Sequence, residues 1–397
     1  MSDKKNLLYT MGLAYDCCCA VILCLGMPLF LFSKKLRQYL RSRQRINQVI
    51  GLVKAAGEKP VFLYCSSIGE LEQAMPLITR LKASAIPYFV FAHSQNGLIH
   101  ARNMHLEHIA LTPLDFFIGW QQIFKICQPR LCIVNRHEYW PGFVLNAILR
   151  SKLYLVNTVE KDYRNVAYRW YIHWLRRHCA AVFFVNSPKS RAAHFISTGD
   201  TRKDRLHERA NVEAASIAAL RERLTHHRKK VLVLGNAYLE DVEILQKVMT
   251  LRPAIPDEWQ IVIVPARPGM ADPVKAALNA HTHNVVIDAS FGKLFSWYQC
   301  ADAAWIGGGF NDKGIHNTLE AGIAGAVLLS GPNLAQQPDA LAAVQAGFLH
   351  ICENAKACIS ILETADRHQA AHSELDKTSP TELIFKSIFH KNPAQTL

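Results

Sequence analysis

Short runs of apolar residues alternate with longer amphipathic segments over most of the chain. The first run is Val61–Cys65 (VFLYC), and apolar residues then recur every three or four positions through residues 71–84. An uninterrupted apolar run of this length is typical of a strand buried on both faces, whereas the wider spacing is typical of a helix with one buried face. The alternation continues to about residue 186. It predicts a parallel, doubly wound α/β sheet with ligand sites at the carboxyl ends of its strands.

A second alternation starts at residue 231 with VLVLGNA and continues through AVLLSGP (326–332). Between the two, residues 197–229 carry clustered charges and an Ala-rich helix, as expected of a connection. The chain therefore divides into an N-terminal hydrophobic and basic segment (1–45), a first α/β domain (46–210), a linker (211–229), a second α/β domain (230–372) and a C-terminal helix and tail (373–397). The amphipathic TELIFKSIF in the tail is expected to pack on the outside or to cross back to the first domain.

The most hydrophobic stretch, Met11–Phe32, precedes the first domain. Asp16 and Pro28 interrupt it, and a helix from Cys17 to Phe32 reaches about 24 Å, short of the roughly 30 Å hydrocarbon core of a bilayer. The basic run SKKLRQYLRSRQR follows without an acidic residue. We expect a marginal span or a partly inserted anchor that keeps the following domain on the cytoplasmic side. The alternative is a buried hairpin helix followed by a solvated basic helix.

The composition and net charge limit the classes of partner that the chain is expected to bind. Half of the residues are hydrophobic and 19% are charged, as in a folded protein, and the net charge of +13 indicates a polyanionic partner. No nucleic-acid-binding motif is present, so we expect no nucleic acid but an anionic membrane or a phosphorylated substrate. The 11 cysteines form no paired framework, which favours a reducing, cytoplasmic compartment. No cluster of residues has the spacing of a metal site.

A glycine-rich loop in the second domain is a candidate phosphate site. Residues 301–330 read as a strand, a loop with glycines at 307–309, the start of a helix and a second strand. Glycines let a ligand approach the backbone closely, and the N–H groups at a helix N-terminus attract phosphate. His316, Asn317 and Glu320 lie near that first turn. In the alternative interpretation, Asn317 and Glu320 only form a capping box and the glycines only a tight turn.

Two carboxylates follow apolar strands in the first domain. Glu70 lies in the first turn after VFLYC, where it could take a proton from a substrate hydroxyl, or it could form a capping box with Ser67. Glu138 follows RLCIVN in a similar position, and it could instead pair with Arg136 or another base. The residues alone leave both alternatives open.

Basic side chains at two further places could meet phosphate. The charges of residues 202–205 (RKDR) are typical of a solvated turn, but beside an interdomain cleft they could also contact an anion. Arg267 follows the strand-like run WQIVIVP.

Several short motifs occur in a characteristic order. They are Ser66-Ser67-Ile68-Gly69-Glu70, Glu138-Tyr139-Trp140-Pro141, Gly199-Asp200-Thr201-Arg202-Lys203-Asp204, the segment from Gly308 and Gly309 through Gly314 to His316-Asn317-Thr318-Leu319-Glu320, and Gly331-Pro332. Together they resemble the motifs of the 3-deoxy-D-manno-octulosonic acid (Kdo) transferases, which act on lipid A precursors. The resemblance extends from the N-terminal anchor to about Cys352. Each motif is weak alone, and the complete ordered set is a strong signal.

This resemblance implies the GT-B fold of glycosyltransferases: two doubly wound Rossmann-like domains facing a cleft, with an N-terminal membrane-anchor helix. It implies transfer of Kdo from CMP-Kdo to a hydroxyl of lipid IV-A in lipopolysaccharide biosynthesis, with inversion at the anomeric carbon. The expected partners are thus a CMP-sugar donor, a phosphorylated lipid acceptor and the anionic cytoplasmic face of the bacterial inner membrane. CMP-Kdo is a substrate here, and no cofactor or metal is expected.

The resemblance also implies roles for individual residues. Glu70 is the expected base, and the phosphate of CMP is expected to contact the glycine loop. The expected acceptor-binding residues are Ser67, Gly69 and Glu138. The expected donor-binding residues are Arg202, Asp204, Asn236, Arg267, Gly308, Gly309, His316, Asn317 and Glu320.

Four departures from the family pattern leave the exact sugar and acceptor open. They are Arg136 where many members have an acidic residue, Val159 in place of an arginine, Ala237 within the Asn236-Ala237-Tyr238 segment, and Ala266, which shifts the basic group to Arg267. The alternatives are a transferase for another CMP-activated ulosonic acid or another acceptor, and a catalytically silent paralogue that binds nucleotide or lipid.

Overall fold

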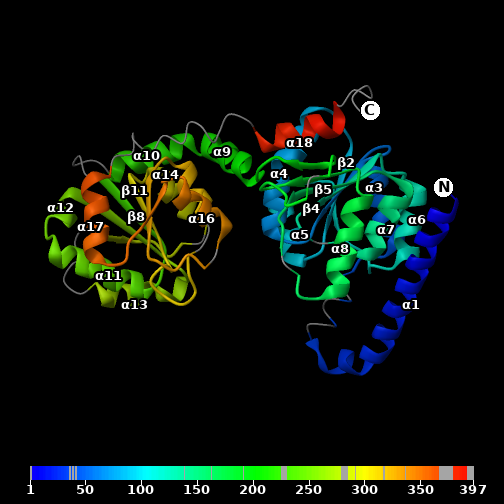
Figure 1. The fold of residues 1–397 in the computed structure, drawn as a ribbon, viewed down its shortest axis with the longest axis horizontal. Helices are drawn as coiled ribbons and strands as arrows, with labels where there is room; N and C mark the ends of the chain where they lie inside the picture. Colours follow the sequence, from blue (N-terminus) through cyan, green and yellow to red (C-terminus); the bar gives the residue numbers. More distant parts are fainter. Residues whose placement is uncertain are drawn as a thin grey trace. The chain divides into compact units, whose positions relative to one another are not determined.

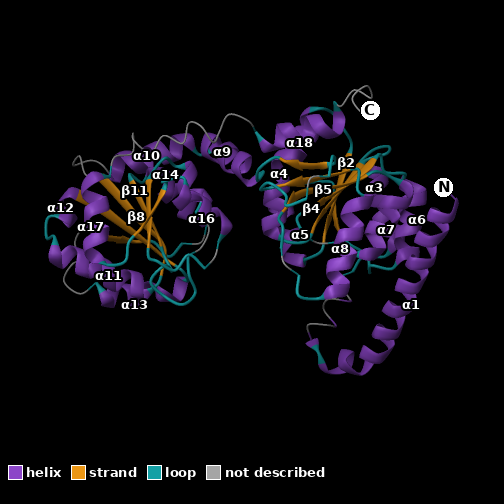
Figure 2. Cartoon of the chain, in the orientation of Figure 1, coloured by secondary structure: helices purple, strands orange, loops and turns teal. Residues whose placement is uncertain are grey.

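The chain forms two compact units, each built on a parallel β-sheet covered by helices (Figures 1 and 2). Unit 1 comprises Met1–Arg205 and Thr378–Leu397, and unit 2 comprises Leu206–Lys377. The computed structural model describes residues 2–34, 37, 40, 43–137, 139–161, 163–190, 192–224, 230–278, 285–290, 292–315, 318–335, 337–365 and 379–390. Three residues expected at the site, Glu138, His316 and Asn317, lie outside these ranges.

Unit 1 contains a seven-stranded sheet of order β3-β2-β1-β4-β5-β6-β7, and every neighbouring pair is parallel. The strands are β1 (Val61–Cys65), β2 (Tyr88–Ala92), β3 (Ile109–Leu111), β4 (Leu131–Asn135), β5 (Leu153–Thr158), β6 (Ala181–Phe184) and β7 (Phe195–Ser197). Its helices are α1 (Ser2–Phe32), α3 (Ile46–Ala55), α4 (Ile68–Ala83), α5 (Gln95–Asn103), α6 (Phe117–Cys127), α7 (Pro141–Arg150), α8 (Val166–His178) and α18 (Pro380–Phe389).

Helices cover both faces of this sheet. Phe62 and Tyr64 of β1 pack with α3, α6, α7 and α8, whereas Val61, Leu63 and Cys65 pack with α4, α5 and α18. Successive residues of a strand point to opposite faces, so a strand between two helical layers must be apolar throughout. The continuous apolar runs of the sequence are explained by this arrangement.

Helix α1 is longer than the sequence suggested. It runs without interruption through Asp16 and packs on α6 and α7. Among the described residues, Asp3–Gly26 is the segment whose length and composition would allow it to cross a membrane, with a mean hydropathy of 1.8.

Unit 2 contains a six-stranded parallel sheet of order β10-β9-β8-β11-β12-β13. The strands are β8 (Lys230–Ala237), β9 (Trp259–Pro265), β10 (Val285–Ile287), β11 (Ala303–Ile306), β12 (Val327–Ser330) and β13 (Leu349–Ile351). The helices are α10 (Ala214–Leu224), α11 (Leu239–Leu251), α12 (Ile255–Glu258), the 3-10 turn η1 (Pro268–Met270), α13 (Ala271–Ala277), α14 (Leu294–Cys300), α15 (Leu319–Ile323), α16 (Pro338–Gln345) and α17 (Ala355–Thr364). Helices α11, α13 and α17 cover one face, and α14, α15 and α16 cover the other.

The units do not divide where the sequence suggested. The division falls between Arg205 and Leu206, inside α9 (Arg202–Val212), whereas the sequence suggested residue 210. The expected linker contains α10, which packs on α14 as part of unit 2. The C-terminal α18 crosses back to unit 1 and packs on α4.

Candidate active site

The carboxylate of Glu70 is buried at the carboxyl end of β1, with only 8% of the residue exposed. Ser67 caps α4, because its Oγ accepts a hydrogen bond from the Glu70 N–H at 3.4 Å. A reciprocal capping box would direct the Glu70 carboxylate to the Ser67 N–H. Instead Oε2 accepts from the N–H and the Oγ–H of Ser66, each at 2.7 Å. The cap and an oriented carboxylate therefore coexist in one turn.

A buried polar network fixes the backbone of the first turn of α4, which contains Glu70. Asn135, the last residue of β4, donates from Nδ2 to the Glu70 carbonyl oxygen at 2.6 Å. Asn157 donates from its own Nδ2 to Oδ1 of Asn135 at 2.8 Å and accepts at Oδ1 from the Thr201 N–H at 3.0 Å. Thr201 Oγ1 in turn donates to the main-chain oxygen of Gln73 in α4. The carboxyl ends of β4 and β5 thus fix the backbone around Glu70.

A second polar group lies at the ends of β2 and β3. His93 stacks on Trp140 with the ring centroids 4.7 Å apart and an interplanar angle of 15°. Arg43 donates to the main-chain oxygen of His93 at 2.8 Å and to Oγ1 of Thr112 at 2.5 Å. Burial, together with the nearby Arg43 charge, lowers the pKa of His93 to about 4, so this imidazole is neutral near pH 7.

The expected acceptor-binding residues are partly brought together. Ser67 and Gly69 are exposed in the first turn of α4, beside the buried Glu70. The network of Asn135 and Asn157, and the separate group around His93, were missed in the sequence. The available signal was their position at strand ends: Asn135 is the last residue of β4, Asn157 is the last but one of β5, and His93 directly follows β2.

The cluster at residues 202–205 has structural partners in unit 1 instead of forming a solvated turn. Arg202 forms an ion pair with Asp200 at 2.6 Å, and Gln73 donates to the same carboxylate at 2.6 Å. Asp204 accepts from the Thr381 N–H at 2.7 Å and thereby caps α18. Charge compensation and capping account for the described contacts of these two residues, and their expected roles toward the donor stay predictions.

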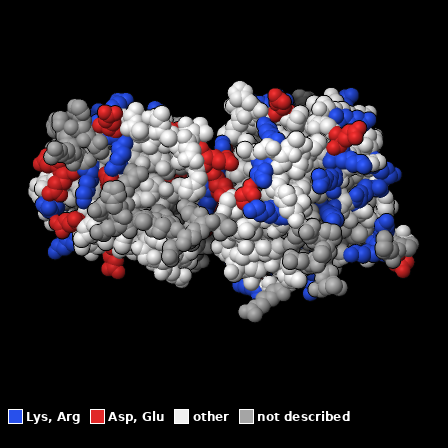
Figure 3. Space-filling view, turned by 90° about the horizontal axis from the view of Figure 1, so that it is seen from above, with Lys and Arg blue, Asp and Glu red and all other residues white. Residues whose placement is uncertain are grey.

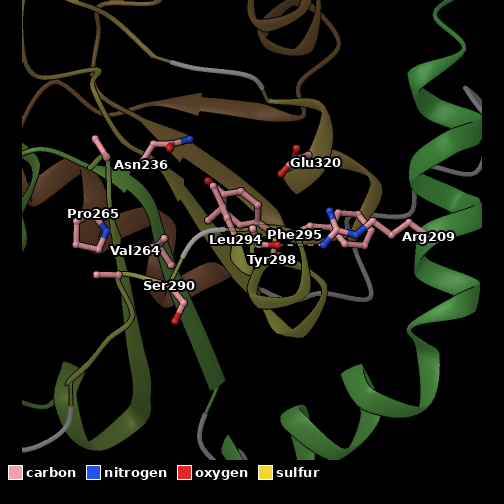
Figure 4. A pocket seen from close by; sticks show the side chains of 12 residues that line it. Arg209, Asn236, Val264, Pro265, Ser290, Leu294, Phe295, Tyr298 and Glu320 are labelled. Atoms are coloured by element: carbon pink, nitrogen blue, oxygen red, sulfur yellow. Dashed lines mark hydrogen bonds between the residues drawn. The ribbon is translucent and has the colours of Figure 1, made fainter. Parts of the chain in front are cut away.

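Unit 2 contains a cavity of about 310 Å³ near the carboxyl ends of β8 and β9 (Figure 4). This volume is within the range of small-ligand sites, roughly 300–1,000 Å³. The cavity is lined by Arg209, Asn236, Val264, Pro265, Ala266, Ala289, Ser290, Gly292, Leu294, Phe295, Tyr298 and Glu320. Two of the expected donor-binding residues, Asn236 and Glu320, are therefore brought to one cavity.

Arg209 is a cavity residue that the sequence did not single out. It reaches in from α9 and lies over the ring of Phe295, with Cζ 4.5 Å from the ring centroid (Figure 4). Its Nε donates to Glu213 at 2.6 Å, and Nη2 donates to the Gly292 oxygen at 3.1 Å. These contacts hold a cation and an aromatic ring together at the cavity wall, where they could contact an anionic nucleotide.

The glycine loop is held by a carboxylate from α11. Asp241 Oδ2 accepts from the Gly308 N–H at 2.8 Å and from the Tyr238 N–H at 3.0 Å. Burial raises the pKa of Asp241 to about 6, partly offset by these hydrogen bonds. The Gly308 N–H is therefore directed to Asp241 in this structure. Its expected contact with phosphate, and that of Gly309, stay predictions.

The glycines of this loop also permit close packing between backbones. A Cβ on Gly308, whose φ is +93°, would lie 2.3 Å from the Gly314 oxygen, and one on Gly309 would lie 2.5 Å from the Gly331 nitrogen. Glycine is thus required for the fold of the loop, whether or not a phosphate binds.

Arg267 is exposed in the turn after β9 and does not line the cavity. Within the described parts of the chain, no group of three or more His, Cys, Asp or Glu residues could hold a metal ion.

Residues 41–209 match the family model described as 3-deoxy-D-manno-octulosonic-acid transferase (kdotransferase). This match, together with the relatives below, supports the Kdo transferase family for this chain. It is 23% identical over 312 residues to the 3-deoxy-D-manno-octulosonic acid transferase of Haemophilus influenzae, covering 70% of this chain and 73% of that relative. It is 24% identical over 362 residues to the transferase of Chlamydophila psittaci, covering 82% of each.

Solved structures of low sequence identity show the fold of this chain. The UDP-GlcNAc 2-epimerase of Neisseria meningitidis superposes with a TM-score of 0.62 at 16% identity, covering 84% of this chain and 100% of that one. A glycosyltransferase from Rickettsia africae superposes with a TM-score of 0.60 at 12% identity, covering 85% and 100%. The predicted GT-B fold and the glycosyltransferase class are confirmed.

Proposed function

We propose that this enzyme transfers Kdo from CMP-Kdo to a hydroxyl of a lipid A precursor, lipid IV-A, with inversion at the anomeric carbon. The observation that carries the proposal is the buried Glu70 carboxylate, fixed by Ser66 at the end of β1 in a Kdo transferase domain. An inverting displacement needs a base that takes the proton from the attacking hydroxyl, and a positioned carboxylate can do this.

In the proposed mechanism Glu70 is the base. The two Ser66 donors orient its carboxylate and stabilise its negative charge. Asn135 holds the carbonyl of the same residue, so neither the backbone nor the side chain is loose. Such preorganisation lets the carboxylate meet the hydroxyl without first rearranging.

The donor is proposed to bind in the cavity of unit 2. Glu320 can accept hydrogen bonds from the ribose hydroxyls, and the Phe295 ring with Arg209 offers an apolar and cationic wall to the nucleotide. Arg267, together with His316 and Asn317, is proposed to stabilise the departing phosphate, because positive charge and N–H donors stabilise the leaving group.

The excess of basic residues in unit 1 supports the proposal that the reaction takes place at an anionic membrane surface. Lys and Arg outnumber Asp and Glu by more than two to one in unit 1, whereas acidic residues are slightly in excess in unit 2. Figure 3 shows basic side chains gathered over the face of unit 1 that it displays. A basic surface beside an apolar helix favours contact with the headgroups of the cytoplasmic leaflet.

The test is incubation of the full-length protein with CMP-Kdo and lipid IV-A, followed by mass spectrometry of the lipid. We expect a mass increase that corresponds to added Kdo. Lack of added mass, while a known Kdo transferase is active in parallel, would overturn the proposal. Transfer from another CMP-activated ulosonic acid in place of CMP-Kdo would overturn the assigned sugar and retain the reaction class.

The base is tested by Glu70→Gln. We expect transfer to fall by a factor on the order of 10³, since general base catalysis contributes roughly 10²–10⁴, while CMP still binds to unit 2. Glu72→Gln is the matched control on the same helix, because Glu72 pairs instead with His100 and Arg205 at 2.6 and 2.7 Å. Equal losses in the two variants would point to a structural role for both carboxylates.

A further inference from the structure

Helix α1 is attached to unit 1 by polar contacts as well as apolar ones. Asp16 Oδ1 accepts from the Phe117 N–H at 2.5 Å, and Oδ2 accepts from the Ile118 N–H at 2.9 Å. These are the first two residues of α6, whose own N-cap residue provides no side-chain cap. The charge that interrupts the apolar segment thus satisfies the N-terminus of a helix that lies about 100 residues later.

Two further contacts fix the orientation of α1. The Tyr15 hydroxyl donates to Asp115 Oδ2 at 3.0 Å, and Leu8 is buried against Phe117 and Leu145. Figure 1 shows the first part of α1 running beside α6 and α7. One face of the helix is therefore a fixed wall of unit 1.

An apolar groove of about 950 Å³ lies along this wall. Its residues on α1 are Leu13, Asp16, Cys17 and Ala20, which are spaced by three and four and so share one helix face. The remaining walls are Leu40, Arg43, Gln44, Arg45, Ile46, Pro113, Leu114, Phe116, Ile118 and Gly119. Because Asp16 is bonded to two N–H groups of α6, the groove can accept an apolar ligand despite this carboxylate.

The surroundings of the groove favour a lipid chain. Further along α1, the side chains of Ile22 and Leu25 are 67% and 75% exposed, so the helix that walls the groove also presents a surface suited to a bilayer. Arg43 and Arg45 line the groove and give it cations that complement a phosphate-bearing headgroup.

The groove is connected to the turn that carries Glu70. Arg43, which lines the groove, donates to the His93 oxygen at 2.8 Å. The next residue, Ser94, donates its N–H to the Ser66 oxygen at 3.2 Å, and Ser66 holds the Glu70 carboxylate. The groove wall is thus linked through His93 and Ser94 to the serine that holds the proposed base.

We propose that this groove binds an acyl chain of the phosphorylated lipid acceptor, an inference that rests on the proposed function. Burial of the chain against α1 contributes affinity through apolar area removed from water. It also directs the sugar hydroxyl toward Glu70, so the chain serves acceptor recognition as well as membrane attachment.

Two adjacent cysteines provide a direct test. Cys17 lines the groove, whereas Cys18 does not, and both are exposed. The full-length protein in detergent is treated with N-ethylmaleimide, with lipid IV-A or with the same disaccharide bisphosphate stripped of its acyl chains, and alkylation is mapped by mass spectrometry. We expect lipid IV-A to slow alkylation of Cys17 at least fivefold relative to Cys18 and the deacylated compound to have no such effect. Equal protection of both cysteines would overturn the proposal.

A pair of tryptophan substitutions tests the consequence for transfer. Cys17→Trp fills the groove, and Cys18→Trp is the matched control outside it. We expect Cys17→Trp, but not Cys18→Trp, to lower the ratio of kcat/KM for lipid IV-A to that for the deacylated acceptor by about tenfold. Ala20→Trp, which fills the same groove from the next turn, is expected to act like Cys17→Trp.

The outcomes separate the inference from the proposed function. If no variant and no wild-type sample transfers Kdo, the proposed function fails, while protection of Cys17 still reports lipid in the groove. If transfer occurs and the two groove variants, Cys17→Trp and Ala20→Trp, keep the wild-type ratio, the groove proposal fails. Protection of Cys17 that depends on protein concentration and not on lipid would assign the groove to a second copy of the chain.

Discussion

Asn135 donates a hydrogen bond of 2.6 Å to the main-chain oxygen of Glu70, so the end of β4 holds the first turn of α4 at the residue that we propose as the base. Both residues are buried, and Asn135 also accepts from Asn157. The position of the carboxylate therefore depends on a neighbouring strand and not only on its own helix. This relationship leads to the first prediction.

Asn135→Leu is expected to lower kcat for transfer at least tenfold, because it frees the Glu70 turn to move. It should also cost roughly 2–4 kcal/mol in the free energy of unfolding, since the Glu70 oxygen and Asn157 lose a buried partner. Asn146→Leu is the control: Asn146 is equally buried and donates to Phe117 and Gly142, away from Glu70. Kinetics and urea unfolding of both variants check this. If the two variants lose the same amount of stability and their kcat values fall equally, the fall in kcat reflects stability alone. That result would contradict a positioning role for Asn135.

The second prediction concerns pH and the glycine loop. The pKa of Asp241 is about 6 in the folded state against an ordinary value of 3.8, so the folded protein binds a proton more tightly than the unfolded chain. The stabilisation that results is complete below about pH 4 and is lost as pH rises through about 6. It amounts to something on the order of 3 kcal/mol.

Asp241→Asn is expected to remove that part of the pH dependence while keeping an oxygen that can accept from the Gly308 N–H. Thermal unfolding at pH 5 and pH 7.5 checks this, and the wild-type protein should gain more stability than the variant on going to pH 5. Asp115→Asn is a useful comparison, because burial also raises the pKa of Asp115 to about 6, but in unit 1. Identical pH profiles of wild type and Asp241→Asn would contradict the assignment.

The sequence predicted features that depend on neighbouring residues in the chain, and it did not predict features that depend on contacts between distant residues. Strands such as Val61–Cys65 were predicted because a strand that is buried on both faces has a continuous run of apolar residues. The role of Asp16 was not predicted, because its partners, Phe117 and Ile118, lie about 100 residues away and no local pattern reveals them. In the sequence alone, Asp16 is only a charge within an apolar segment.

The same reasoning applies to the site. Glu70, Asn236 and Glu320 were predicted as site residues because strand ends and family motifs mark them in the sequence. The loop at 307–309 was interpreted as a phosphate cradle, yet the Gly308 N–H is bonded to Asp241, which precedes it by 67 residues. Arg209 was missed because a single arginine on a polar helix has no local signature, and its meaning depends on its contact with Phe295.

The third prediction is that Arg209 contributes to nucleotide binding. Arg209→Met keeps a long side chain but removes the charge at the cavity wall. We expect the Kd for CMP to rise about tenfold, in line with the loss of a charge-assisted hydrogen bond to the phosphate worth roughly 1.5–3 kcal/mol. Arg252→Met is the control, because Arg252 pairs with Glu258 and Glu363 and does not line the cavity. Isothermal titration with CMP measures both, and an unchanged Kd in Arg209→Met would exclude the residue from the donor site.

The last prediction is that α1 is held to unit 1 by close packing at Gly12. A Cβ at this position would lie 2.4 Å from the Phe117 ring, whereas one at Gly26 would meet nothing within 4 Å. Gly12→Leu should therefore push α1 away and withdraw Asp16 from the N-terminus of α6, and Gly26→Leu should not. Amide hydrogen exchange of the peptide that contains Phe117 and Ile118 reports this directly, because the Asp16 carboxylate accepts from both amides.

We expect at least tenfold faster exchange in Gly12→Leu than in Gly26→Leu or wild type. Equal exchange in all three would mean that α6 keeps its N-terminus satisfied without α1, and the helix would then be an attached anchor and not a wall of the unit.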